Sequence, residues 1–252
     1  MKDHVVQKLL TINREFYQDF ADSFSQTRQR IQHGILLILN DLPRLGKFLD
    51  LGCGNGALAL EWDRQRRSGF YLGMDFSQQL LDCARKKLET VRMSPNLTVD
   101  FFQADLVADE WDLKVKQYAW DGILAFAVLH HIPSQDLRFK LLEKVNGLLT
   151  EEGQFIFSVW QFQNSPKLLA RQINWDKVGL TDADVEPGDT LLDWRSDVKD
   201  ESSRVGLRYV HLFSRNELVE LAAESRFQIL DQFDSDGFNG RLGHYEIWQK
   251  KT

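Results

Sequence analysis

A glycine-rich loop and the acid in front of it are the first residues of this sequence that could do chemistry. The stretch 48-FLDLGCGNGALALEW-62 is an apolar run that ends in Asp50 and then breaks into glycines. Glycines let a ligand approach the backbone closely because they have no side chain. The loop fits the dinucleotide-binding fingerprint, whose third position can be alanine, through Gly52, Gly54 and Ala57.

Two further acids follow at spacings that suit a nucleoside. Asp75 lies 19 residues past Gly56, where an acid that chelates ribose hydroxyls is expected. Asp105, in 103-QAD-105, closes a third apolar segment, where Asp105 or Gln103 could bind an adenine amino group. Each acid is expected at the carboxyl end of a strand, the edge at which open α/β sheets bind ligands.

The loop alone does not separate a nicotinamide dinucleotide from other cofactors. Asp50 would sit awkwardly beside a pyrophosphate but favourably beside an ammonium group. No tyrosine has a lysine four residues later, the pair used by short-chain dehydrogenases, and no Gly-Lys-Ser/Thr of a P-loop occurs. A cofactor with a cationic amino-acid end, a ribose and an adenine, but no phosphate, fits best. S-adenosylmethionine meets this description.

Strands that alternate with helices must position these residues. Apolar periodicity and capping residues predict helices over 4–24, 27–41, 57–67, 77–91, 134–149 and 214–225, and strands over 47–51, 70–75, 97–105, 121–132 and 153–160. The last two strands, 227–234 and 242–250, read as an antiparallel hairpin at one edge. This order predicts an α/β fold with a doubly wound, Rossmann-like, mostly parallel sheet.

The predicted single domain, residues 1–252, divides into four parts. These are an N-terminal helical cap (1–46), a cofactor-binding core (47–160), an insertion (161–207), and a C-terminal helix and hairpin (208–252). The insertion contains nine acidic and four basic residues between Asp176 and Arg204. We expect little regular structure there and a role as a lid or substrate-side loop.

Composition sets the outer limits of function. The 252 residues are 43% apolar and carry a net charge of −6, so broad electrostatic binding of nucleic acid is not indicated. No apolar run reaches the roughly 18 residues of a membrane span, and the N-terminus lacks the apolar segment of a secretory signal. Cys53 and Cys83 have no CxxC partner, which argues against a metal site and favours a reducing, cytoplasmic setting.

Residues 48–160 resemble the class I S-adenosylmethionine-dependent methyltransferases. The resemblance rests on 48-FLDLGCGNG-56, 71-YLGMDFS-77, 103-QADL-106, 124-LAFAVLHHIP-133 and 145-VNGLLTEEGQFIFSVW-160. It implies a seven-stranded sheet and S-adenosylmethionine as the cofactor. It also implies cofactor contacts from Asp50, Gly52, Cys53, Gly54, Asn55, Gly56, Asp75, Phe76, Gln103, Ala104, Asp105 and Leu106, with Phe126 and Ala127 beneath the cofactor.

A narrower resemblance extends over most of the chain. The segments 16-FYQDFADSFSQTRQR-30, 158-SVWQFQ-163 and 207-LRYVHLFSRNEL-218 are similar to the tRNA wobble-uridine methyltransferases, which methylate the carboxylate of 5-carboxymethyluridine. This resemblance implies that Tyr17 and Arg28 help to bind the cofactor. A guanidinium such as that of Arg28 can hold a carboxylate through two hydrogen bonds.

The methyl acceptor stays open between a modified tRNA and a small carboxylic acid or amine. A carboxylate is ionised at neutral pH and needs only donors to position it, for which Arg208, Tyr209 and His211 are candidates. An amine or hydroxyl would need a base, for which His130 or His131 is suited. Trp160 and Trp194 are candidate substrate contacts. The acidic insertion also suits a small activating partner protein, and a non-catalytic cofactor-binding subunit is the third alternative.

Overall fold

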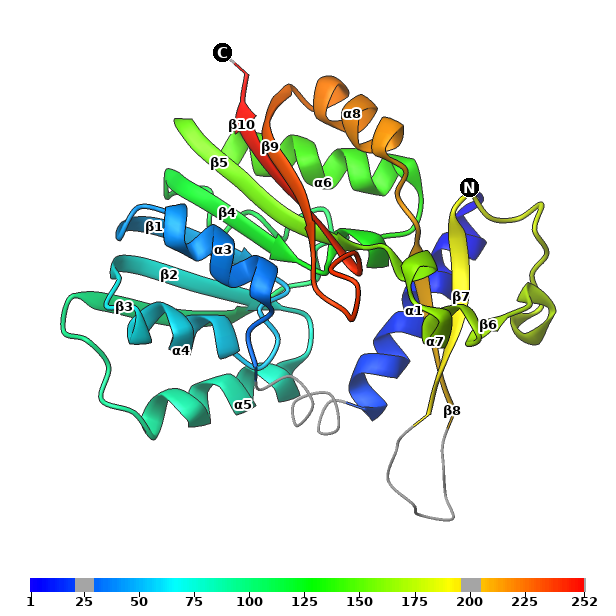
Figure 1. The fold of residues 1–252 in the computed structure, drawn as a ribbon, viewed down its shortest axis with the longest axis horizontal. Helices are drawn as coiled ribbons and strands as arrows, with labels where there is room; N and C mark the ends of the chain where they lie inside the picture. The colour runs from blue at the N-terminus through cyan, green and yellow to red at the C-terminus, as the bar shows by residue number, and fades with distance from the viewer. Residues whose placement is uncertain (21–29, 196–204, 252) are drawn as a thin grey trace.

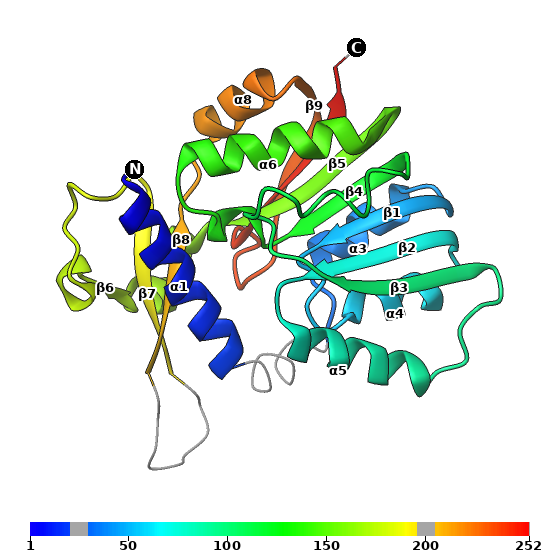
Figure 2. The same cartoon turned by 180° about the vertical axis from the view of Figure 1, so that it is seen from behind.

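The computed structural model describes residues 1–20, 30–195 and 205–251, which are built around a seven-stranded sheet with helices on both faces (Figures 1 and 2). The strand order is β3-β2-β1-β4-β5-β10-β9, with β10 antiparallel to both of its neighbours and the other pairs parallel. The strands are β1 Leu45–Leu51, β2 Ser68–Asp75, β3 Leu97–Gln103, β4 Trp120–Phe126, β5 Leu149–Trp160, β9 Phe227–Ser235 and β10 Gly243–Lys250. The predicted doubly wound sheet with a C-terminal hairpin is confirmed.

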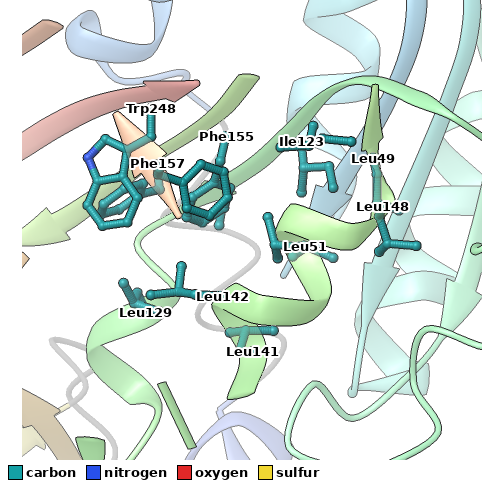
Figure 3. Packing of buried hydrophobic residues seen from close by; sticks show 14 of the residues in the cluster. Leu49, Leu51, Ile123, Leu129, Leu141, Leu142, Leu148, Phe155, Phe157 and Trp248 are labelled. Carbon is teal, nitrogen blue, oxygen red and sulfur yellow. The ribbon is translucent and has the colours of Figure 1, made fainter. Parts of the chain in front are cut away.

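The sheet has an apolar core on each face because successive strand residues point to opposite sides. Leu49 and Leu51 of β1 face the helices α6 (Gln135–Leu148) and α8 (Arg215–Glu224). Figure 3 shows this core, where Leu141, Leu142 and Leu148 of α6 lie with Phe155, Phe157 and Trp248. The preceding residue, Phe48, faces the other core, which is covered by α3 (His33–Asp41), α4 (Ala57–Arg64) and α5 (Gln78–Glu89).

Serine caps fix where several helices begin. The hydroxyl groups of Ser77, Ser134 and Ser214 each accept a hydrogen bond from the backbone N–H three residues later, at the starts of α5, α6 and α8. The predicted starts of these helices are confirmed within a residue. Helix α1 covers Asp3–Asp19, and α3 starts only at His33. The predicted helices 4–24 and 27–41 are therefore longer than the observed ones. Residues 21–29, into which both predictions extend, lie outside the described residues.

The region between β5 and α8 corrects a prediction. Residues 161–207 were expected to have little regular structure, but most of those described form defined elements. These are η2 (Phe162–Asn164), α7 (Pro166–Leu169), β6 (Gln172–Ile173), η3 (Trp175–Val178), β7 (Asp189–Arg195) and the start of β8 (Val205–His211). The three strands form a separate antiparallel sheet, β6-β7-β8. Its apolar residues Leu191 and Tyr209 pack against Val5 and Leu9 of α1, so this sheet has an apolar core of its own.

A buried polar network anchors this small sheet to the core. Asp189 of β7 accepts hydrogen bonds from the Tyr209 hydroxyl and from His211 Nδ1, both at 2.7 Å, and His211 Nε2 lies 2.8 Å from Glu217 at the start of α8. Arg138 of α6 pairs with both Glu186 and Glu217. Burial lowers the pKa of His211, but the hydrogen bonds with Asp189 and Glu217 outweigh it and raise the pKa above its ordinary value. The network therefore favours a charged imidazole.

The length and polarity of the helices also bear on membranes. No helix in the described ranges is long and apolar enough to cross a bilayer.

We expect His211→Gln to destabilise the chain most at low pH. A histidine whose pKa is raised on folding adds stability that is complete below its unfolded pKa and is lost as pH rises through the folded pKa. Urea unfolding should show a loss of about 1–3 kcal/mol at pH 6, the usual cost of a buried hydrogen bond to a charged group, and a smaller loss at pH 9.

His4→Gln is the matched control, because His4 is exposed on α1. It should leave the free energy of unfolding unchanged at both pH values. A loss from His211→Gln that is equal at pH 6 and pH 9 would contradict a charged imidazole in this network.

Candidate functional site

The candidate site is a pocket of about 210 Å³ at the carboxyl ends of the parallel strands. One wall is the sheet edge, with the loop after β1 and the ends of β2 and β4. The other wall comes from α1 and the segment that leads into α3. Figure 2 shows α1 standing beside this edge of the sheet, between the core and the small sheet. The pocket therefore lies where the sequence placed a cofactor, but it has a second wall.

The glycine loop after β1 is folded tightly against β2. Gly52 and Cys53 both donate backbone hydrogen bonds to the Met74 carbonyl, at 2.7 and 2.9 Å. Gly54 has φ +54°, and an added Cβ there would meet no atom within 4 Å, so this glycine opens onto free space. Gly56 has φ +70°, and an added Cβ there would come within 2.7 Å of Ala84. Gly54 thus leaves room for a ligand, whereas Gly56 leaves room for α5.

Two buried carboxylates flank this loop at the ends of β1 and β2. Asp50 accepts a hydrogen bond from the Tyr71 hydroxyl, and Asp75 accepts one from the Gly54 N–H at 2.9 Å and one from the Ser77 N–H at 2.9 Å. Burial raises the pKa of Asp50 to about 7, and the charge of Asp75 adds to that effect against the Tyr71 hydrogen bond. Burial likewise raises the pKa of Asp75 to about 6, although its backbone hydrogen bonds lower it. A cation would favour ionisation of both groups.

Helix α1 contributes a polar face to the pocket. Leu10, Asn13, Arg14 and Tyr17 recur at helical spacing and all line it. Arg14 forms an ion pair with Asp105 at 2.5 Å, and both side chains are partly exposed. Asn13 accepts a hydrogen bond from the Tyr209 N–H at 2.9 Å and donates one to the His131 carbonyl at 3.3 Å. These contacts fasten α1 to the loop after β3, to β8 and to the segment after β4.

His131 has a defined tautomer in this wall. Its Nδ1 lies 3.1 Å from the Tyr209 carbonyl, which can only accept a hydrogen bond, so Nδ1 carries the proton. Neutral His131 then has a lone pair at Nε2, and the Tyr17 hydroxyl lies 2.8 Å from that atom. The Tyr17 ring also contacts Phe76 edge-on, with ring centroids 5.9 Å apart. The pair can therefore pass a proton from the phenol to the imidazole.

Arg208 and Trp160 form a second cluster next to the pocket. The Arg208 guanidinium lies 4.4 Å from the Trp160 ring centroid and 5.0 Å from that of Phe16, and only 5% of the residue is exposed. His130 is fully buried, stacks on Trp160 and accepts a hydrogen bond from the Trp160 N–H at Nδ1. This arrangement joins the end of β5 to β8 through aromatic and cationic contacts.

Most of the residues selected from the sequence come together in the pocket. Those that line it are Tyr17, Asp50, Gly52, Cys53, Gly54, Asn55, Asp75, Phe76, Ala104, Asp105, Leu106, Phe126, Ala127 and His131. Arg28 lies outside the described residues. Gly56 and Gln103 are absent from the lining, because Gly56 packs on α5 and Gln103 points outward to donate a hydrogen bond to the Phe76 carbonyl at 2.9 Å.

Other selected residues lie outside the pocket. Tyr209 and His211 were expected to border it, but strand alternation points both into the buried network around Asp189. Arg208 points the opposite way along β8, toward Phe16 and Trp160. Trp194 packs against Phe20, with ring centroids 4.5 Å apart, and Trp160 and His130 lie in the neighbouring cluster.

The sequence prediction named only Tyr17 and Arg28 from the N-terminal segments and missed the other residues there that line the pocket. Besides the α1 face, Arg30, Ile31, Gln32 and Ile35 line the pocket. Leu10, Asn13, Arg14 and Tyr17 recur at helical spacing, so they share one face of α1. The polar residues Asn13 and Arg14 lie on this face, which an ordinary amphipathic helix would bury. This pattern in the sequence could have identified the α1 wall. The lining by 30–35 depends on how the chain enters α3, which spacing does not reveal.

We expect alanine substitutions at Gly54 and Gly56 to differ, because one should mainly affect ligand binding and the other mainly stability. Gly56→Ala should lower the free energy of unfolding by about 1–3 kcal/mol, the cost of overpacking a filled core. Gly54→Ala should cost about 1 kcal/mol in stability through its positive φ, but should weaken the binding of a ligand in the pocket because its methyl group occupies open space.

Urea unfolding and calorimetric titration with S-adenosylhomocysteine measure the two effects on the same preparations. Normal affinity in folded Gly54→Ala would show that the ligand does not approach this part of the loop.

Comparison with known proteins identifies the core. Residues 49–155 match the family described as "Methyltransferase domain". The chain is 30% identical over 154 residues to the mouse tRNA (carboxymethyluridine(34)-5-O)-methyltransferase ALKBH8, a match that covers 61% of this chain and 20% of that protein. The chain thus spans about a fifth of the length of the animal relatives it matches.

Longer matches exist in other organisms. A Schizosaccharomyces pombe protein with the same enzyme name is 23% identical over 240 residues, covering 89% of this chain and 92% of that protein. The crystal structure of an S-adenosylmethionine-dependent methyltransferase from Clostridium acetobutylicum superimposes with a TM-score of 0.63 at 16% identity, covering 94% of this chain and 99% of that one. That likeness establishes the fold.

Proposed function

We propose that this chain transfers a methyl group from S-adenosylmethionine to the carboxylate of a modified uridine in tRNA, a proposal supported by the match of residues 49–155 to the methyltransferase domain family. The observation that carries the proposal is the pair of buried carboxylates, Asp50 and Asp75, on either side of the open glycine loop. The acceptor is proposed from the activity named for the mouse and fission yeast relatives.

The pocket residues fit this cofactor. Bound S-adenosylmethionine supplies a methyl group that is already activated by its positively charged sulfur. Asp75, fixed by the Gly54 and Ser77 amides, is proposed to accept hydrogen bonds from the ribose hydroxyls, and Asp50 is proposed to face the cationic end. Asp105 is proposed for the adenine side, where its ion pair with Arg14 keeps the carboxylate in place. The space beside Gly54 allows close approach to the backbone.

The acceptor side needs positioning more than acid–base chemistry. A carboxylate acceptor is ionised at neutral pH, so no group must remove a proton from it. Alignment of the two reactants then supplies most of the rate enhancement. Tyr17, held by His131 Nε2, is proposed to contact the acceptor, and Arg208 on Trp160 is proposed to add positive potential behind it. For a hydroxyl or amine acceptor, the same Tyr17–His131 pair is the proposed base.

The remaining roles are proposals of the same kind. The acidic region between β5 and α8 is proposed to cover the acceptor side, with a small activating partner protein as one candidate contact. The cytoplasm is the proposed compartment, since the two free cysteines, Cys53 and Cys83, suit a reducing environment.

We expect S-adenosylmethionine to bind more weakly as pH falls. The pKa values of about 7 and about 6 mean that Asp50 and then Asp75 take up protons between pH 8 and pH 5 and lose their attraction for a cation. The dissociation constant should rise by up to about tenfold per pH unit for each group below its pKa. Calorimetric titration across this range measures the effect.

The variant Asp75→Asn shows which of the two pH-dependent steps in binding belongs to Asp75. It should remove the step near pH 6, move the Asp50 step below pH 7 because the charge of Asp75 no longer raises that pKa, and weaken binding at pH 8 by about 1–3 kcal/mol, the usual cost of a hydrogen bond to a charged group. A pH-independent wild-type affinity, or tight binding of NAD, would contradict the proposed cofactor site.

Transfer of tritium-labelled methyl groups tests the acceptor. We expect label in total tRNA, released as methanol by mild alkali because a methyl ester is formed, and lost in Asp50→Asn. Label confined to small carboxylic acids or amines of a metabolite extract would replace RNA by a small-molecule acceptor, while the methyltransferase assignment would stand.

A further inference from the structure

An ordered loop at the pocket edge holds a phenylalanine entirely in solvent. Residues 236–242 connect β9 to β10, and β10 begins at Gly243, which pairs with Trp160 at the end of β5. The loop therefore lies at the carboxyl end of β5, as Figure 1 shows, and the pocket lies at this edge of the sheet. Phe238 is the most exposed large apolar residue among the described parts of the chain.

The loop is fixed on both sides by hydrogen bonds to segments that border the site. On one side, the Gly34 N–H donates to Asp236 at 3.1 Å, next to the pocket-lining residues Ile31 and Gln32. On the other side, Asn239 donates to the Asn164 carbonyl at 3.3 Å, and Asn164 donates to the Arg241 carbonyl at 2.9 Å. A rigid loop exposes the aromatic ring without the entropy cost of ordering it on binding.

Positive charge accompanies the ring. Arg30 on the pocket rim, Lys167 on α7 and Arg241 in the loop are exposed, and no described carboxylate forms an ion pair with them. Asp234 of the hairpin pairs with Arg215 and His244, and Asp236 accepts hydrogen bonds from the Gly34 N–H and the Tyr245 hydroxyl. The three cations thus outnumber Asp236, the one acid of the loop 236–242, although the chain has a net charge of −6.

We propose that Phe238, Arg30, Lys167 and Arg241 form a docking surface for single-stranded RNA, with the Phe238 ring stacking on an unpaired base next to the methylated nucleotide. An exposed aromatic ring flanked by cations is the combination that binds single strands, because every base has a face that can stack while phosphates meet the charges. This inference rests on the proposed function and names the surface that its RNA acceptor uses.

The test compares Phe238→Ala with the wild-type chain on an anticodon stem-loop that carries 5-carboxymethyluridine. Loss of one stacked base should raise the RNA dissociation constant and the KM for RNA by about 5- to 150-fold, corresponding to about 1–3 kcal/mol per base. The dissociation constant of S-adenosylmethionine should stay unchanged. Phe238→Trp should bind RNA like the wild type. Arg241→Gln should reduce the slope of log affinity against log salt by about 1.

Leu230→Ala is the matched control, because Leu230 is an exposed apolar residue of the same hairpin near the opposite end of β9. It should leave RNA binding unchanged. Wild-type methyl transfer to RNA with an unaltered KM in Phe238→Ala would overturn the docking surface alone. Cofactor binding without any transfer to RNA would overturn the proposed acceptor and this surface with it. An unaltered RNA affinity with self-association lost in ultracentrifugation would assign the ring to a contact between two copies and overturn the RNA surface.

Discussion

The burial of two carboxylates at adjacent strand ends is the constraint on which the rest of the site depends. An ionised carboxylate in an apolar surrounding is costly unless donors or a cation compensate it. Asp75 has backbone donors from Gly54 and Ser77, and Asp50 has the Tyr71 hydroxyl, yet both pKa values remain raised. The fold therefore holds two groups whose charge is incompletely compensated, in a pocket that a positively charged ligand can enter.

The glycine loop keeps the two carboxylates buried and still lets a ligand reach them. Its turn returns the chain to hydrogen-bond the Met74 carbonyl, so that the start of α4 and the end of β2 come together around Asp75. The second wall has a different origin. Helix α1 is fixed to β8 through Asn13 and Tyr209, and the same Tyr209 carbonyl sets the tautomer of His131. The small sheet thus acts on the pocket through backbone groups, while its side chains at Tyr209 and His211 serve only its attachment.

The parts that could be predicted from sequence are those set by local rules. The alternation of strands with helices, the capping serines and the acids at strand ends follow from periodicity and spacing, and the doubly wound sheet with its terminal hairpin formed as expected. The side of β8 on which Arg208, Tyr209 and His211 fall depends on register with β7, which a single sequence does not encode. The small sheet escaped prediction because its acids Asp189 and Asp193 are buried where composition indicated solvent. The α1 wall is tertiary, since only packing brings residues 10–17 to the sheet edge.

Net charge is a poor guide to what this surface can bind. A count of the acidic residues between β5 and α8 in the sequence alone argues against RNA binding. In the structure, Asp189 is fully buried against His211, Glu186 pairs with Arg138, and Asp193 is buried in β7. Asp189 and Glu186 contribute less to the potential outside the protein, because His211 and Arg138 offset their field. The proposed RNA surface depends on the balance of exposed charge at the pocket rim, where Arg30, Lys167 and Arg241 have no paired carboxylate among the described residues. A chain that is acidic overall can therefore present a basic edge where its parallel strands end.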